Sequence, residues 1–247
     1  MAAAVIPWLA FAIGLGVFDL RLLLILILLA AVASGWFPVL PGHALTDVLF
    51  LVLMAAVYLA KPFRLLYLSP IEDIRMDVLG QLMWIRTGVL AVLWFRPQYG
   101  KGFGFLPSRR DWSIGLRYYA YFLPAGVALT ALLRFGSFRL AEDYWWKAPA
   151  TFLGIFLVAA LAEEFFFRAL LQQRLSTWLG DTAGLLAASV LFGLAHLGFR
   201  AFPNWKMTAL AALAGLFYGR AFALAGSIRA SMVTHALTVT TWRTFLA

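Results

Sequence analysis

The feature that most constrains this chain is a series of apolar runs, each about as long as a membrane is thick. A helix needs roughly 17 to 25 mostly apolar residues to cross a bilayer. Runs of this kind lie at about residues 2–18, 22–41, 44–60, 78–95, 114–133, 150–172, 183–199, 207–225 and 228–246. We therefore predict an all-α protein, a polytopic transmembrane helical bundle of about eight to nine helices.

The composition supports a chain that spends most of its length in a membrane. Of the 247 residues, 64% are hydrophobic and only 13% are charged, whereas soluble domains carry about 25% charged residues. The net charge of +9 comes from basic residues that mostly flank the apolar runs, which is typical of headgroup contacts and topology signals. No nucleic-acid surface is indicated. The absence of cysteine excludes disulfides, thiol catalysis and thiolate metal sites.

The run at 2–18 lacks the positively charged start of a cleaved signal, so we interpret it as a retained membrane helix. We expect residues 1–76 to form N-terminal transmembrane helices peripheral to the working core, and residues 77–247 to form that core. We expect an integral membrane protein with several passes. Loop charges do not decide the orientation, and the sequence does not indicate an oligomeric state.

Two adjacent carboxylates and an arginine interrupt the run at 150–172. An ionisable side chain at membrane depth costs a few kcal/mol or more, so it normally faces a protein interior or a cavity and marks a functional site. On a helix, Glu164 and Arg168 are four residues apart and can neutralise each other. Glu163 lies about 100° round the helix and has no such partner. We expect Glu164 to be structurally tied and Glu163 to be chemically free. A structural cluster that pins helices together is the alternative.

A histidine in the next run can be placed beside these carboxylates by a simple depth argument. If Gly180-Asp181 is the turn of a helical hairpin, Glu164 lies 17 residues before Asp181 and His196 lies 15 residues after it. At 1.5 Å per residue these are depths of about 26 and 22 Å. The hairpin therefore predicts that His196, inside the 183–199 helix, lies next to the acidic pair. Phe192, one turn earlier, is expected to pack against it.

A second histidine falls at a similar depth in the last run. His235 lies nine residues beyond Gly226, which we expect to be a turn. Gly215 and Gly219, four residues apart, favour close packing of the intervening helix. Three polar helices would then converge on a buried polar pocket. Each histidine could instead serve only as an interhelical hydrogen-bonding group.

Such a pocket suggests two ways of activating water. A poorly solvated carboxylate can act as a general base, while a histidine shares the water or stabilises the developing oxyanion. Alternatively, Glu163, His196 and His235 could hold a divalent metal such as zinc, which lowers the pKa of its bound water. Both routes lead to hydrolysis of an amide bond.

These motifs in this order resemble the CAAX-processing and bacteriocin-processing intramembrane endopeptidases, known as the CPBP or Abi family. The motifs are Glu163-Glu164-x-x-x-Arg168, Phe192-x-x-x-His196 and His235. The resemblance covers roughly residues 96–246 and implies an all-helical membrane protease with its site in the bilayer. The family often has asparagine four residues after the last histidine, whereas this chain has Val239, so a hydroxyl of Thr238 or Thr240 would have to take its place.

The resemblance also implies roles for the residues. Glu163 would activate water with His196 as its partner, Glu164 would be a supporting acid, and Arg168 would be structural. His235 would serve the oxyanion or the metal. We favour the glutamate mechanism, which requires no cofactor. The implied partners are the lipid bilayer and a membrane-associated protein or peptide, cleaved in CAAX-type processing or as part of a sorting system. The implied location is the bacterial inner (cell) membrane.

Competing functions need features that the sequence lacks or shows weakly. A catalytically inactive scaffold or immunity protein would keep this fold, and Val239 is the one hint towards it. A proton-coupled transporter often shows repeated halves with broken helices, and no such repeat is evident. The chain has no Gly-x-Ser-Gly, His-Glu-x-x-His or Gly-x-Gly-Asp motif. This disfavours the serine, zinc site-2 and aspartyl classes of intramembrane protease.

Overall fold

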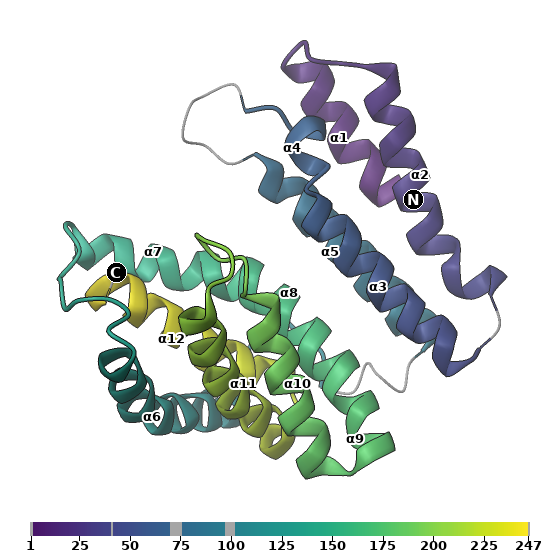
Figure 1. Ribbon diagram of the computed structural model, residues 1–247. Helices are drawn as coiled ribbons and strands as arrows, with labels where there is room; N and C mark the ends of the chain where they lie inside the picture. The colour runs from purple at the N-terminus through teal and green to yellow at the C-terminus, as the bar shows by residue number, and fades with distance from the viewer. Residues whose placement is uncertain (1, 41, 70–75, 97–101, 247) are drawn as a thin grey trace. The chain divides into compact units, whose positions relative to one another are not determined.

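The computed structural model describes residues 2–40, 42–69, 76–96 and 102–246. Throughout these segments the regular structure is helical, which confirms the predicted all-α class, and every predicted apolar run forms a helix. The chain divides into two compact units, Met1–Gly100 and Lys101–Ala247, and each has its own helix packing (Figure 1).

The N-terminal unit contains α1 (Ala2–Gly14), α2 (Leu20–Val39), α3 (Ala44–Ala60), the single turn α4 (Phe63–Leu66) and α5 (Asp77–Phe95). Its core is aromatic, since Trp8, Phe63 and Trp84 are buried. Trp8 Nε1 donates to Leu66 O at 2.6 Å and Trp84 Nε1 donates to Met54 O at 3.0 Å. The buried indoles are therefore satisfied by the main chain.

The border between the two units differs from the predicted one. The sequence placed residues 77–247 together, whereas α5 lies in the N-terminal unit. The reason is its packing, because α5 contacts each of α1, α2, α3 and α4. Its apolar surface is thus shared with the N-terminal helices, and the hydrophobic runs alone do not show with which neighbours a helix packs.

The C-terminal unit contains α6 (Arg109–Leu132), a long rod over 144–179, α10 (Asp181–Ala195), α11 (Trp205–Ala225) and α12 (Ile228–Phe245). The rod is made of α7 (Tyr144–Gly154), η2 (Ile155–Ala160), α8 (Leu161–Glu164), η3 (Phe165–Gln172) and α9 (Gln173–Leu179). Helix α12 packs against α6, α7, η2, α8 and α11, which makes it the inner helix of this unit (Figure 1). The rod and α10 form the predicted hairpin, and Gly180 turns between them with φ 84°.

Local sequence sets where α6 begins and ties it to α12. Ser108 caps α6 through a capping box with Asp111, whose carboxylate accepts from Ser108 N at 2.8 Å. Arg229 Nε, in the first turn of α12, lies 3.3 Å from Asp111 Oδ2. Burial acts to raise the pKa of Asp111, but hydrogen bonds from Ser108 and Ser227 and the charge of Arg229 outweigh it and hold that pKa below its usual range.

Two glycines let α11 approach its neighbours closely, as their spacing predicted. A Cβ on Gly219 would lie 2.3 Å from Leu185 Cδ1 and 2.5 Å from Gln172 Oε1. A Cβ on Gly215 would lie 3.1 Å from Ser189 Cα. Because Gly219 has no side chain, its carbonyl accepts a hydrogen bond from Gln172 Nε2 at 3.1 Å, which joins α11 to η3.

Within the described residues, four helical stretches are long and apolar enough to cross a membrane, namely Leu20–Val39, Asp77–Phe95, Tyr144–Leu179 and Trp205–Ala225. The apolar helices Ala4–Gly14, Leu45–Tyr58 and Asp181–Ala195 are shorter. Helix α12, a predicted span, is outside this group because it carries polar side chains. Its Ser231, Thr234 and His235 are buried, so they face protein rather than lipid.

Candidate active site

The acidic pair lies in a short α-helical stretch between two π-helical ones. Helix α8 ends in Glu163 and Glu164, with η2 before it and η3 after it. A π-helical turn bonds to the fifth residue rather than the fourth, and such turns are frequent at functional sites. The expected ion pair still forms across this region, since Arg168 Nε lies 3.0 Å from Glu164 Oε2.

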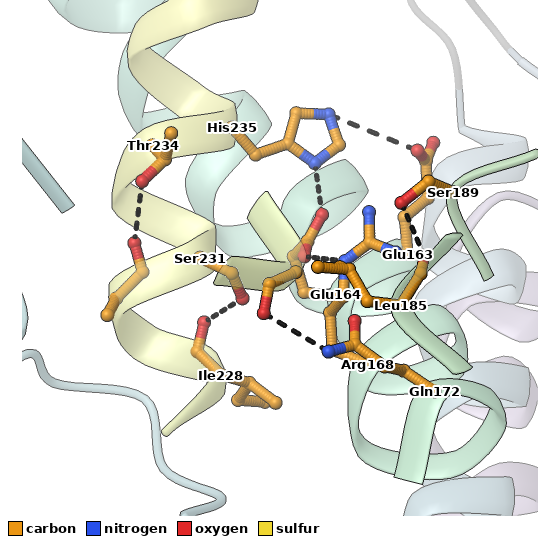
Figure 2. A network of polar contacts seen from close by, with 12 residues as sticks. Glu163, Glu164, Arg168, Gln172, Leu185, Ser189, Ile228, Ser231, Thr234 and His235 are labelled. Carbon is orange, nitrogen blue, oxygen red and sulfur yellow. Dashed lines mark hydrogen bonds and ion pairs between the residues drawn. The ribbon is translucent and has the colours of Figure 1, made fainter. Parts of the chain in front are cut away.

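Glu164 is completely enclosed and both of its oxygens have partners (Figure 2). Oε2 faces Arg168, and Oε1 lies 2.8 Å from His235 Nδ1 on α12. Both partners are donors, so they stabilise the ionised carboxylate in a site that solvent does not reach. Both oxygens of Glu164 are therefore engaged by neighbouring side chains, and the carboxylate holds the imidazole of His235 in place.

The Arg168 guanidinium completes this buried group by stacking on aromatic rings. Its Cζ lies 5.0 Å from the ring centroid of Phe192 and 5.9 Å from that of Tyr218. Its Nη1 and Nη2 are shielded from solvent and hydrogen-bond to none of the described residues. The ring faces thus supply the stabilisation that hydrogen bonds do not. Phe192, predicted to support His196, contacts Arg168 as well.

His196 lies just after α10, not inside the 183–199 helix that the sequence predicted. The last turn of α10 tightens, so that the His196 N–H donates to Gly193 O at 2.9 Å instead of to Phe192 O four residues back. The Phe192 carbonyl therefore does not accept the main-chain hydrogen bond that a regular helix would give it. It is instead contacted by the imidazole, with His196 Nδ1 2.8 Å from Phe192 O.

These two contacts determine which imidazole nitrogens carry protons. A main-chain carbonyl and an ionised carboxylate can only accept hydrogen bonds, so Nδ1 of His196 and Nδ1 of His235 must both donate. In neutral histidines the Nε2 atoms are then without hydrogens and present lone pairs. Both rings turn these Nε2 atoms towards the same carboxylate.

That carboxylate is Glu163. Its Oε2 lies 3.9 Å from His196 Nε2 and 3.9 Å from His235 Nε2, and Figure 2 shows the contact with His235. Oε2 accepts no hydrogen bond from a described residue. The Glu163 side chain is 26% exposed, against 0% for Glu164. Three lone pairs therefore converge on one point, an arrangement suited to bind a group with hydrogens to donate and to take a proton from it.

The three converging side chains line a cavity of about 550 Å³ in the C-terminal unit. Most of its wall is apolar, with Phe122, Leu210 and Trp242 among the lining residues. The volume lies within the range of small-molecule and peptide pockets. Val239 also lines it, so the position where the resembled family often has asparagine does face the site.

A resident zinc ion would have to use Glu163, His196 and His235. One carboxylate and two imidazoles are a known catalytic zinc set. However, tetrahedral ligands at about 2.0–2.2 Å from zinc lie roughly 3.3–3.5 Å apart, and the carboxylate–imidazole separations here are wider. No group of three or more such side chains in the described part of the chain is arranged to hold a metal ion. With these separations the three residues do not form a zinc site.

The structure brings together the predicted residues Glu163, Glu164, His196 and His235, with Arg168 and Phe192 packed beside them. Sequence reasoning missed Tyr218, whose ring stacks on His235 with centroids 4.7 Å apart and planes 16° from parallel. A signal was present, because Tyr218 follows Gly215 by three residues and so shares the face that the glycines mark. The chemical roles of all these side chains remain predictions.

Comparison with known proteins connects this geometry to a family. Residues 145–241 match the family of type II CAAX prenyl endopeptidase Rce1-like proteins, a stretch that contains both glutamates and both histidines. Neither the curated proteins nor the solved structures gave a match. Residues 145–241 are therefore similar to the Rce1-like CAAX endopeptidases, the family that the motifs resemble, and the match together with the long apolar helices indicates an integral membrane protein.

Proposed function

We propose that this chain is an intramembrane endopeptidase in which Glu163 activates a water molecule to hydrolyse a peptide bond. The supporting observation is the convergence of Glu163 Oε2 with the Nε2 atoms of His196 and His235, each 3.9 Å away. Because all three atoms present lone pairs, a water molecule can donate both of its hydrogens there. The Rce1-like match, which implies protease activity, supports the same reading.

The hydrolysis can be written with these side chains alone. The water oxygen attacks the carbonyl carbon of the scissile bond, and one water proton passes to the Glu163 carboxylate. The carbonyl π electrons move to its oxygen, which becomes an oxyanion. When the oxyanion collapses, the C–N bond breaks and the leaving nitrogen takes the proton from Glu163. His196 Nε2 accepts the second hydrogen of the water and so positions it for attack.

Burial and pairing explain why Glu163, rather than Glu164, is proposed as the base. Both oxygens of Glu164 are engaged by Arg168 and His235, and its side chain is 0% exposed. The charge of Glu164 is therefore neutralised by Arg168, and each of its oxygens already accepts a hydrogen bond. The Glu164 carboxylate can also stabilise a positive charge on His235, which would favour the negative charge that develops on the substrate.

We further propose a membrane-associated protein or peptide as the substrate, cleaved in CAAX-type processing. The cavity next to Glu163 is lined mostly by apolar side chains and suits an apolar peptide segment. A chain ending in cysteine, two aliphatic residues and a final residue provides such a segment once its cysteine is prenylated. Processing within a sorting system and a place in the cell membrane of a bacterium remain predictions from the resemblance.

The test is cleavage of an internally quenched, prenylated CAAX peptide by the purified protein in liposomes. We expect two fragments whose masses add up to the peptide plus one water. His196→Ala should lower kcat by about 10²-fold, since it removes the group that positions the water. His43→Ala, which alters an exposed histidine of the other unit, is the control. No cleavage by the wild-type protein, or an equal effect of both substitutions, would contradict the proposal.

Removal of metal is expected to leave this activity within about twofold. The reason is that the carboxylate and imidazoles can perform each proton transfer without a metal, and their spacing is wide for zinc. The measurement is kcat after dialysis against EDTA and 1,10-phenanthroline, with metal content determined on the same sample. Loss of activity that zinc restores would show that Glu163, His196 and His235 close around a metal ion.

A further inference from the structure

The proposed hydrolysis requires hydrogen-bond donors for the oxyanion, and the converging side chains do not supply them when neutral. Glu163 and the two Nε2 atoms are acceptors, as their contacts show. Arg168 is engaged with Glu164 and with aromatic rings, and is 0% exposed. Preorganised donors at the oxyanion are usually a large contribution to catalysis. While His235 is neutral, they must therefore come from another part of the cavity wall, and Val239 does not supply one where the resembled family often has asparagine.

Tyr218 on α11 is such a donor. It lines the cavity although it is only 2% exposed. Its ring is held on one face by the imidazole of His235 and at its edge by Phe192, with the Arg168 guanidinium 5.9 Å from its centroid. A ring fixed by three neighbours also fixes the direction of its hydroxyl. The hydroxyl of Thr238 on α12 lies near it, although no hydrogen bond joins the two in this structure.

Thr238 differs from the other buried hydroxyls around the site. Thr234, Ser231 and Ser189 each donate to a main-chain carbonyl, at 3.0, 2.8 and 2.7 Å, which is what helical serines and threonines commonly do. Thr238 Oγ1 is shielded from solvent and has no hydrogen-bond partner among the described residues, the Tyr218 hydroxyl included. It lines the cavity three residues after His235, on the same face of α12. Its hydrogen is therefore unused in this structure.

We infer that Tyr218 donates its hydroxyl hydrogen to the oxyanion of the scissile carbonyl, and that Thr238 orients this hydroxyl by donating to the phenol oxygen. The inference rests on the proposed hydrolysis. In the attack step the carbonyl oxygen gains the π electrons while the water proton goes to Glu163, so Tyr218 keeps its proton throughout. Tyr218 is then a catalytic residue, and Thr238 is a positioning residue that acts through it.

Several other polar side chains of this region are less well placed. Tyr119 Oη and Thr241 Oγ1 lie 2.6 Å apart and satisfy each other. Arg243 is exposed and follows His235 by eight residues, about 12 Å along the helix. Thr240 Oγ1 is also without a hydrogen-bond partner in the described structure, but Thr240 is not among the residues that line the cavity.

The experiment compares Tyr218→Phe with Tyr121→Phe, which removes a hydroxyl from an exposed tyrosine of the same unit that does not line the cavity. In the liposome assay with the prenylated peptide, Tyr218→Phe should lower kcat by about 10²–10³-fold and leave KM within threefold. Tyr121→Phe should keep kcat within twofold. Full kcat in Tyr218→Phe, or equal losses in both variants, would overturn the inference.

Thr238 provides an independent test should Tyr218→Phe fail to fold. Thr238→Val should lower kcat about tenfold at unchanged KM, while Thr238→Ser, which retains the hydroxyl, should restore it. A phosphinate peptide, whose tetrahedral oxygen mimics the oxyanion, should bind about tenfold more weakly to Thr238→Val, whereas the uncleaved peptide should bind equally. Equal weakening of both peptides would indicate a merely structural role and overturn the assignment.

The outcomes separate this inference from the proposed function. An inactive Glu163→Gln protein together with a fully active Tyr218→Phe protein would overturn the oxyanion assignment alone. An active Glu163→Gln protein, or a wild-type protein that neither cleaves the peptide nor binds the phosphinate, would overturn the proposed hydrolysis and with it the role of Tyr218.

Discussion

Glu163→Gln is expected to lower kcat for peptide cleavage by about 10²–10⁴-fold, the contribution of a general base, while the protein keeps its fold. Glutamine has nearly the same shape but cannot take a proton from water. Its amide can donate a hydrogen to one of the two Nε2 atoms that lie 3.9 Å from Oε2. The variant should therefore be at least as stable as the wild type. The measurements are kcat in liposomes and the thermal midpoint of the purified protein.

The matched control for this change is Glu142→Gln, which removes the same charge from an exposed position of the same unit. It should leave kcat within twofold. If Glu163→Gln is as active as this control, Glu163 is not the base, and the convergence of the three side chains has another purpose. If Glu163→Gln instead loses its fold, its carboxylate contributes to stability, which contradicts the expectation that it is chemically free.

Arg168→Ala is expected to destabilise the protein by about 3–5 kcal/mol, because it leaves a buried carboxylate without its cation. Glu164 and Arg168 are both 0% exposed, so water cannot replace the lost partner. The rings of Phe192 and Tyr218 would also lose the guanidinium that packs on them. We expect low yield from membranes and a thermal midpoint lower by on the order of 10 °C.

Arg117→Ala, at an exposed position of α6, is the control and should leave yield and midpoint unchanged. A second variant separates charge from packing. Glu164→Gln combined with Arg168→Met removes both charges but keeps a hydrogen-bond acceptor for His235, so it should recover part of the lost stability. Wild-type yield and midpoint in Arg168→Ala would show that the ion pair is not what stabilises this part of the bundle.

The sequence predicted those features that depend on spacing along one helix or on the depth of a hairpin. The Glu164–Arg168 pair follows from four-residue spacing, and it forms even though η3 is wound as a π-helix. The turn at Gly180 follows from the break between two apolar runs. The close packing of α11 follows from Gly215 and Gly219, which have no side chain to hold the helices apart.

Features that depend on contacts between distant helices were not accessible in this way. The pairing of His235 with Glu164 rather than only with Glu163 depends on how α12 is rotated, and apolar spacing does not fix that rotation for a helix enclosed by protein. The stacking of Tyr218 on His235 depends on the same rotation. Likewise, packing decides that α5 belongs to the N-terminal unit. An apolar run does not show which helices it will pack against.

The position of His196 one residue beyond α10 couples the chemistry of the site to the length of a helix. The helix ends where the His196 N–H turns to Gly193 O, and the imidazole donates its Nδ1 hydrogen to the Phe192 carbonyl that this N–H does not use. The direction of the ring is therefore set by main-chain atoms of α10 rather than by a neighbouring helix. A substitution that shifts the end of α10 would move the imidazole away from Glu163 without altering either glutamate.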